Sequence, residues 1–152
     1  MTELAFQDQY ADEYAHCYGC GRLNEDGMKL KSYWDGEETV CRFTPDPKYS
    51  GGYPGFLYGG MIASLMDCHG AATAWAAKAR TVQQEATRFV TASLKVDFRA
   101  PTPTNVELEV RGKITEIKGR KVVVGLTLSA AGKVCAEGSA VMVEIPITRQ
   151  EG

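Results

Sequence analysis

The sequence has little that would place it outside the ordinary globular proteins. It has only two histidines and a formal net charge of -2, so it lacks the basic excess of a general nucleic-acid binder. It also lacks an uncharged apolar run of the roughly 18 residues that a membrane span needs. The longest candidate, residues 59–77, contains Asp67 and His69, and residues 1–12 have no apolar core of signal-peptide type. We therefore expect a cytoplasmic protein without nucleic-acid or membrane partners.

The cysteines are few and odd in number. Five cysteines without a signal peptide favour reduced thiols over a disulfide framework. Cys17 and Cys20 form a CxxC pair, but a structural zinc site needs about four ligands, and the sequence has no second CxxC or HxxxH. We therefore predict a tight turn with packed thiols and no metal, with a zinc site and a redox role as the alternatives.

The length and composition are those of one domain with a real core. The chain has 152 residues, of which 44% are hydrophobic and 24% charged. No internal repeat or low-complexity linker divides it. We expect an N-terminal arm and loop over residues 1–27, a folded domain over residues 28–146 and a C-terminal tail over residues 147–152.

One helix and six strands are predicted. Residues 61–80 are rich in Ala, Leu, Met and Ile, which predicts a helix, and their apolar positions spread round the cylinder, which predicts burial on most sides. Alternating patterns predict two short strands before the helix and four longer ones after it. The predicted strands are residues 28–33, 39–43, 89–98, 106–116, 121–129 and 134–145. One curved antiparallel sheet wrapped around one helix is the economical packing, and it gives an α+β fold.

Three segments in a fixed order carry a resemblance to a known family. HCYGCGRLNEDGMKLK, YPGFLYGGMIASLMD and VDFRAPTP together resemble the hotdog-fold acyl-CoA thioesterases, most of all the group around the phenylacetate-pathway and 4-hydroxybenzoyl-CoA thioesterases. The best anchor is Gly59-Gly60 at the start of the helix, with Asp67 seven residues beyond Gly60. The resemblance implies a hotdog fold, in which a curved sheet wraps one long central helix. It also implies a homodimer, or a dimer of dimers, whose sheets join and whose active sites lie at the interface.

Asp67 is the leading catalytic candidate. It is the only carboxylate in the predicted helix, and a charge among apolar residues is costly unless it is compensated. By resemblance it matches the family's catalytic carboxylate, which acts as a general base on water or as a nucleophile. The alternative is a structural Asp that faces a solvent gap or pairs with an Arg.

The start of the helix and the next strand supply further candidates. The Gly60 N–H could polarise a thioester carbonyl, and Gly59 would let the ligand approach the backbone closely. The alternative is a simple loop-to-helix turn. Thr91 matches a Ser or Thr that positions the carboxylate or water, and a Thr favoured by a sheet face is the alternative.

Two positions depart from the family's pattern. Tyr58 stands where the family often has His before the two glycines, and Gly51 and Gly52 stand where it often has Gln or Asn. Tyr58 could still bind the carbonyl or a water. Because both departures remove polar groups, a non-catalytic acyl-thioester binding protein is the alternative function. A hydratase would need a His beside an acidic group; neither His16 nor His69 lies at the start of the helix, and we expect His69 to be structural.

The remaining candidates concern the substrate. By resemblance, cations at a strand end and in a hairpin turn meet the CoA phosphates, with a solvated basic turn as the alternative. These are Arg99, Lys118, Arg120 and Lys121. An aromatic or short-to-medium acyl group would contact apolar residues near the start of the helix. These are Tyr53, Phe56 and Met61. The predicted reaction is hydrolysis of an acyl-CoA to a carboxylate and CoA, with no cofactor besides the CoA of the substrate.

Overall fold

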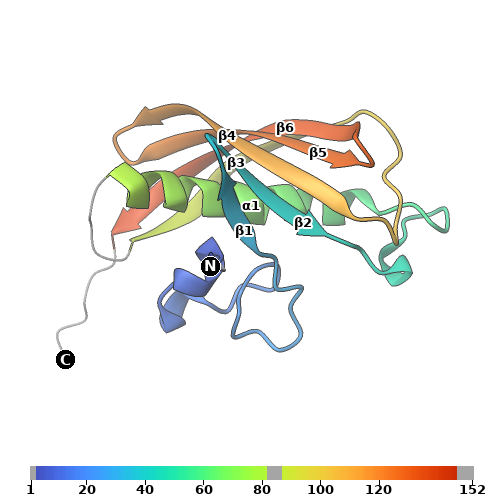
Figure 1. Ribbon diagram of the computed structural model, residues 1–152, viewed down its shortest axis with the longest axis horizontal. Helices are drawn as coiled ribbons and strands as arrows, with labels where there is room; N and C mark the ends of the chain where they lie inside the picture. Colours follow the sequence, from blue (N-terminus) through green and yellow to red (C-terminus); the bar gives the residue numbers. More distant parts are fainter. Residues whose placement is uncertain (1–2, 82–86, 147–152) are drawn as a thin grey trace.

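The computed structural model describes residues 3–81 and 87–146, and it consists of one long helix against one antiparallel sheet (Figure 1). The helix is α1 (Gly59–Thr81), and the six described strands lie in the order β1-β2-β4-β5-β6-β3. The strands are β1 (Ser32–Asp35), β2 (Glu38–Phe43), β3 (Thr87–Phe98), β4 (Leu108–Lys118), β5 (Lys121–Ala130) and β6 (Lys133–Pro146). The α+β hotdog architecture expected from the sequence is confirmed.

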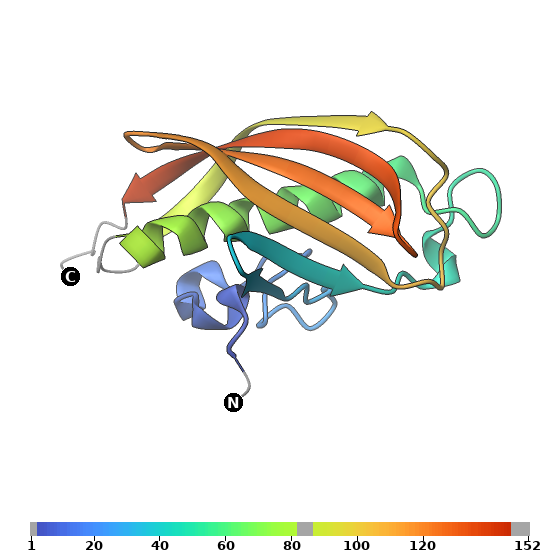
Figure 2. The same cartoon turned by 45° about the horizontal axis from the view of Figure 1, so that its top comes forward.

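Helix α1 is buried from two sides. Its residues Leu65, Met66 and Ala74 are fully buried in the main core with the inner side chains of the strands. On the opposite side lies the N-terminal segment (residues 6–20), which contains two short 3-10 helices, η1 (Phe6–Gln9) and η2 (Asp12–Tyr14). Figure 2 shows α1 between the sheet and this segment. A helix enclosed in this way has no single apolar stripe, which is why its apolar residues spread round the cylinder.

The first predicted strand is placed too early. Residues 28–31 do not belong to β1, because the Met28 and Leu30 N–H groups donate to the carbonyls of Tyr18 and Gly19 in the N-terminal segment. Lys29 has a φ of 55°, which a strand does not accommodate. The other predicted elements agree with the structure to within about two residues at most ends. A third 3-10 helix, η3 (Pro47–Tyr49), lies in the loop before α1. The predicted tail, residues 147–152, lies outside the described residues.

Strand β3 forms one edge of the sheet, and it has a bulge. It pairs with β6 along its whole length, and within the described part of the chain its other side has no strand neighbour. The register shifts between Thr91 and Ser93, so that the β3 backbone carries one additional residue there. Such bulges re-aim side chains. In the described ranges no helix combines the length and the apolar character that crossing a membrane requires.

Candidate functional site

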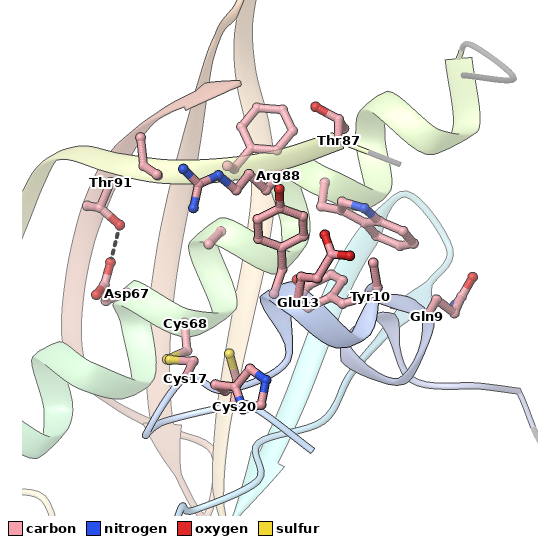
Figure 3. Close-up of a pocket in the computed structure, with 17 residues that line it drawn as sticks. Gln9, Tyr10, Glu13, Cys17, Cys20, Asp67, Cys68, Thr87, Arg88 and Thr91 are labelled. Carbon is pink, nitrogen blue, oxygen red and sulfur yellow. Dashed lines mark hydrogen bonds between the residues drawn. The ribbon is translucent and has the colours of Figure 1, made fainter. Parts of the chain in front are cut away.

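A pocket of about 640 Å³ lies between α1, β3 and the N-terminal segment (Figure 3). Each of the three elements supplies one wall. The lining from α1 and β3 is Asp67, Cys68, Ala71, Trp75, Thr87, Arg88, Phe89, Val90 and Thr91. The lining from the N-terminal segment is Gln9, Tyr10, Ala11, Glu13, Tyr14, His16, Cys17 and Cys20.

Asp67 and Thr91 meet at this pocket, and the catalytic roles that the family resemblance implies for them stay predictions. The Thr91 hydroxyl donates a hydrogen bond to Asp67 Oδ1 at 2.5 Å (Figure 3). Asp67 projects from a partly buried turn of α1, and Thr91 lies directly before the β3 bulge. One carboxylate oxygen is therefore held by the protein, and Oδ2 is left for water or substrate.

Three thiols lie together beside Asp67, and the third, Cys68 of α1, was expected from the sequence only to pack in the core. The Sγ atoms of Cys17, Cys20 and Cys68 all lie within 4.8 Å of one another, and Cys17 Sγ is 3.9 Å from Cys68 Sγ. Hydrogen bonds from the Cys20 and Cys68 thiols lower the pKa of Cys17 to about 2. Its interaction with Cys17 raises the pKa of Cys20 to about 12, and a separate interaction with Cys17 raises the pKa of Cys68.

Aromatic side chains form much of the remaining wall. Tyr10, Tyr14, Trp75 and Phe89 line the pocket, and the Tyr10 and Trp75 rings meet edge to face at 5.3 Å. Arg88 reaches across the pocket from β3, and its guanidinium lies 5.0 Å from the centre of the Tyr14 ring. None of these residues was a sequence candidate. Tyr10 and Tyr14 lie in an arm whose aromatic residues follow no strand or helix period that would have indicated them.

His69, next to the cluster in sequence, points to the opposite side of α1 and has a structural role. It is fully buried, with Nδ1 at 2.8 Å from Ser32 Oγ and Nε2 at 3.0 Å from Thr39 Oγ1. The Thr73 hydroxyl donates to the His69 carbonyl and approaches Thr39 Oγ1 at 2.6 Å, while Gln7 Nε2 donates to Ser32 Oγ. Burial lowers the pKa of His69 to about 4. The expectation of a satisfied structural histidine is confirmed.

The start of α1 forms a separate region. Gly59, Phe56 and Arg99 line a smaller pocket of about 360 Å³ there. The Tyr58 ring lies against Gly60, where an added Cβ would be 2.6 Å from a ring carbon, and the backbone of Tyr58 packs on Gly51. Within one chain, the predicted site residues therefore divide between two pockets, and Tyr58 and Gly60 line neither of them.

The other predicted substrate contacts are scattered. Tyr53 is largely exposed and contacts Phe56, with 5.8 Å between ring centroids, whereas Met61 lies in the core with 2% of its surface exposed. The hairpin with Lys118, Arg120 and Lys121 lies near the C-terminal end of α1, where Lys78 Nζ donates to the Gly119 carbonyl. Arg99 follows β3 at the other end of α1. One chain therefore does not bring Arg99 and the basic hairpin to a common phosphate, and the predicted roles of all these residues stay predictions.

Comparisons with known proteins agree with this architecture. The family model of the thioesterase superfamily matches residues 54–137. An acyl-coenzyme A thioesterase THEM4 of Xenopus laevis is 36% identical over 84 residues, which cover 55% of this chain and 33% of that protein. The Bos taurus THEM4 is 30% identical over 93 residues, covering 58% and 32%. The matches thus span about a third of the length of these curated relatives.

Solved structures extend the likeness over nearly the whole chain. A thioesterase superfamily protein from Shewanella loihica PV-4 is 50% identical, with a TM-score of 0.69 over 89% of this chain and 98% of that one. A thioesterase from Haemophilus influenzae has a TM-score of 0.71 over 99% of this chain and 100% of that one, but at 12% identity it supports the fold alone. With its hotdog fold, its carboxylate on the central helix and these matches, the chain belongs to the thioesterase superfamily.

Proposed function

We propose that this protein hydrolyses an acyl-CoA thioester, with Asp67 as the catalytic carboxylate. The observation that carries the proposal is the position of Asp67 on the wall of the large pocket, held by the Thr91 hydroxyl. Membership of the thioesterase superfamily and the acyl-CoA thioesterases among the matched relatives support the choice of substrate class.

In the proposed reaction, Asp67 acts as a general base. Oδ2 takes a proton from water, and the water oxygen forms a bond to the thioester carbonyl carbon. The carbon–sulfur bond then breaks, and the proton passes from Asp67 to the CoA thiolate. The products are a carboxylate and free CoA. Thr91 is a positioning residue, because its hydrogen bond fixes the orientation of the carboxylate. The reaction needs no redox cofactor.

The negative charge on the carbonyl oxygen requires a donor, and the Gly60 N–H of the same chain is too far away. Gly60 and Asp67 are seven residues apart on α1, which is about 10 Å along the helix axis. A thioester carbonyl held by the Gly60 N–H is thus out of reach of Asp67 in the same chain. A second copy of the chain is the natural source of the donor.

The free edge of β3 indicates how two copies would meet. Two β3 strands that pair antiparallel about a two-fold axis join the two sheets and relieve an exposed twelve-residue edge. The midpoint of Thr87–Phe98 lies one to two residues beyond Thr91, or about 5 Å along the strand. Since Thr91 contacts Asp67, the two-fold axis lies about 5 Å from Asp67, measured toward the start of α1.

This symmetry brings the two predicted groups together. Because the axis lies about 5 Å from Asp67, the partner's own Asp67 lies about 10 Å away along the helix direction. The partner residue opposite Asp67 is therefore about 10 Å, or seven residues, nearer the start of the partner's α1. That residue is Gly60 of the partner subunit. We therefore place the active site at a dimer interface, with Asp67 and Thr91 from one copy and the Gly60 N–H from the other.

The aromatic wall of the pocket suggests the acyl group. Trp75, Phe89 and Tyr14 offer flat apolar surface within a pocket of about 640 Å³, which suits an aromatic or short-to-medium acyl chain. In this proposal the acyl pocket lies against the N-terminal segment, away from Tyr53 and Met61.

The proposal is tested with a panel of short, medium, long and aromatic acyl-CoAs, by following thiol release with a thiol-reactive dye. We expect turnover of one acyl class, with aromatic or short-to-medium acyl-CoAs preferred. Acyl-CoA binding measured without any turnover across the panel would overturn the enzymatic proposal in favour of a binding protein.

A further inference from the structure

The three thiols of Cys17, Cys20 and Cys68 have no part in the proposed hydrolysis, yet the fold brings them together from distant parts of the chain. A tetrahedral zinc ion with Zn–S bonds of about 2.3 Å places its sulfur ligands about 3.8 Å apart. Cys17 Sγ and Cys68 Sγ are 3.9 Å apart, and all three Sγ atoms lie within 4.8 Å of one another. The sulfurs are thus already close to the spacing that one metal ion requires.

The loop around the CxxC pair is shaped to keep the sulfurs close to α1. A Cβ at Gly19 would lie 2.4 Å from Cys68 Sγ, so a larger residue there would displace either the loop or the Cys68 thiol. A Cβ at Gly21 would lie 2.4 Å from the Cys17 backbone nitrogen.

A disulfide explains the cluster less well. A disulfide needs two sulfurs at about 2.0 Å and leaves the third without a role. The remaining cysteines, Cys41 and Cys135, are buried elsewhere in the core and do not join the group. Packing alone also fails as an explanation, because Cys17 is exposed to the pocket.

We propose that Cys17, Cys20 and Cys68 bind one Zn²⁺ ion through three thiolates, with water in a fourth position that faces the pocket. This revises the sequence-based prediction of a metal-free turn, which counted only the CxxC pair. The ion fastens the N-terminal segment to α1 next to Asp67, and so fixes the pocket wall that carries Tyr10 and Tyr14. The site does not depend on which thioester the protein hydrolyses.

The test measures metal directly on the full-length, reduced protein. We expect about one zinc ion per chain by elemental analysis after purification without added chelator. After removal of the zinc, titration with Co²⁺ should give thiolate-to-metal charge-transfer absorption that saturates at about one equivalent, which Zn²⁺ then displaces. Neither readout requires activity, so the result is independent of the proposed hydrolysis.

Matched cysteine variants locate the site. Cys68→Ala should lower the metal content at least tenfold, whereas Cys41→Ala and Cys135→Ala, which also remove buried thiols, should retain it. The proposal is overturned if reduced wild-type protein gives no charge-transfer absorption with Co²⁺, or if the two control variants lose the metal as Cys68→Ala does. Mass spectrometry that finds a disulfide within the cluster of the protein as purified would also overturn it. The Co²⁺ titration uses wild type, so it decides the matter even if Cys68→Ala does not fold.

Discussion

His69 should make the stability of this protein fall as the pH is lowered toward 4. The hydrogen bonds around its ring require one neutral tautomer. The Thr73 hydroxyl donates to the His69 carbonyl, so toward Thr39 it can only accept. The Thr39 hydroxyl therefore donates to Thr73 or to the Gly112 carbonyl. Since that proton is used, Thr39 accepts the hydrogen bond from His69 Nε2–H. Ser32 accepts from Gln7, and its own proton is then donated to Nδ1. A second proton on the ring would break this arrangement around a fully buried side chain.

The magnitude follows from the two pKa values. Burial lowers the pKa of His69 from 6.5 to about 4 in the folded protein. The full contribution is therefore present above pH 6.5, and it is lost as the pH falls through the window down to about 4, because the unfolded chain binds the proton first. The total loss is about 3 kcal/mol of unfolding free energy, of which about 2 kcal/mol falls between pH 7 and pH 5.

The assay is denaturant unfolding at a series of pH values, with protein concentration fixed and with a chelator present so that metal binding does not contribute. The control is His69→Gln, which keeps a donor and an acceptor at this position but does not titrate. Wild type should lose about 2 kcal/mol more than the variant between pH 7 and pH 5. Parallel losses in the two proteins would show that His69 is not held neutral, and would refute the reasoning.

Three further predictions concern the site and the core. Thr91→Val removes the hydrogen bond to Asp67, so kcat should fall about tenfold with little change in KM. Thr91→Ser keeps the hydroxyl and should keep most of the activity. An unchanged kcat in Thr91→Val would contradict the positioning role. Met61 is buried in the core, so Met61→Ala should lower the unfolding free energy by about 2–5 kcal/mol without changing acyl preference. An altered acyl preference would show that Met61 lines the acyl pocket. Mixed chains of Asp67→Asn and Gly60→Pro, refolded together, should recover about a quarter of wild-type activity, since half of the dimers carry one intact site. Pro is tolerated in the first helical turn but lacks the N–H, and Gly60→Ala, whose Cβ also meets the Tyr58 ring, is the control that retains the N–H. Recovery of no activity would place both groups in one chain.

The elements that sequence predicted well depend on local patterns. The composition of α1 and the alternation in the four long strands are properties of neighbouring residues, so they could be recognised without tertiary information. Asp67 stood out for a similar reason, as the only carboxylate in an apolar helix. The position of residues 28–31 could not be predicted in this way, because it depends on hydrogen bonds to the N-terminal segment.

The sequence could not predict contacts between residues that are far apart in the chain. Cys68 is 51 residues from Cys17, and no spacing rule connects a single helical cysteine with a distant CxxC pair. The aromatic wall was hidden for the same reason, since Tyr10 and Tyr14 lie in a segment without periodicity. Conversely, Arg99 and the basic hairpin looked alike in sequence, but the fold puts them at opposite ends of α1.

The central claim is that Asp67 carries out thioester hydrolysis, and one comparison tests it most directly. Wild type and Asp67→Asn are assayed side by side for thiol release from the preferred acyl-CoA, with acyl-CoA binding measured on both. Asn has the size of Asp but cannot take a proton from water, so kcat should fall at least about 100-fold while binding is retained. Equal rates in the two proteins would contradict the account, because the reaction would then not depend on Asp67.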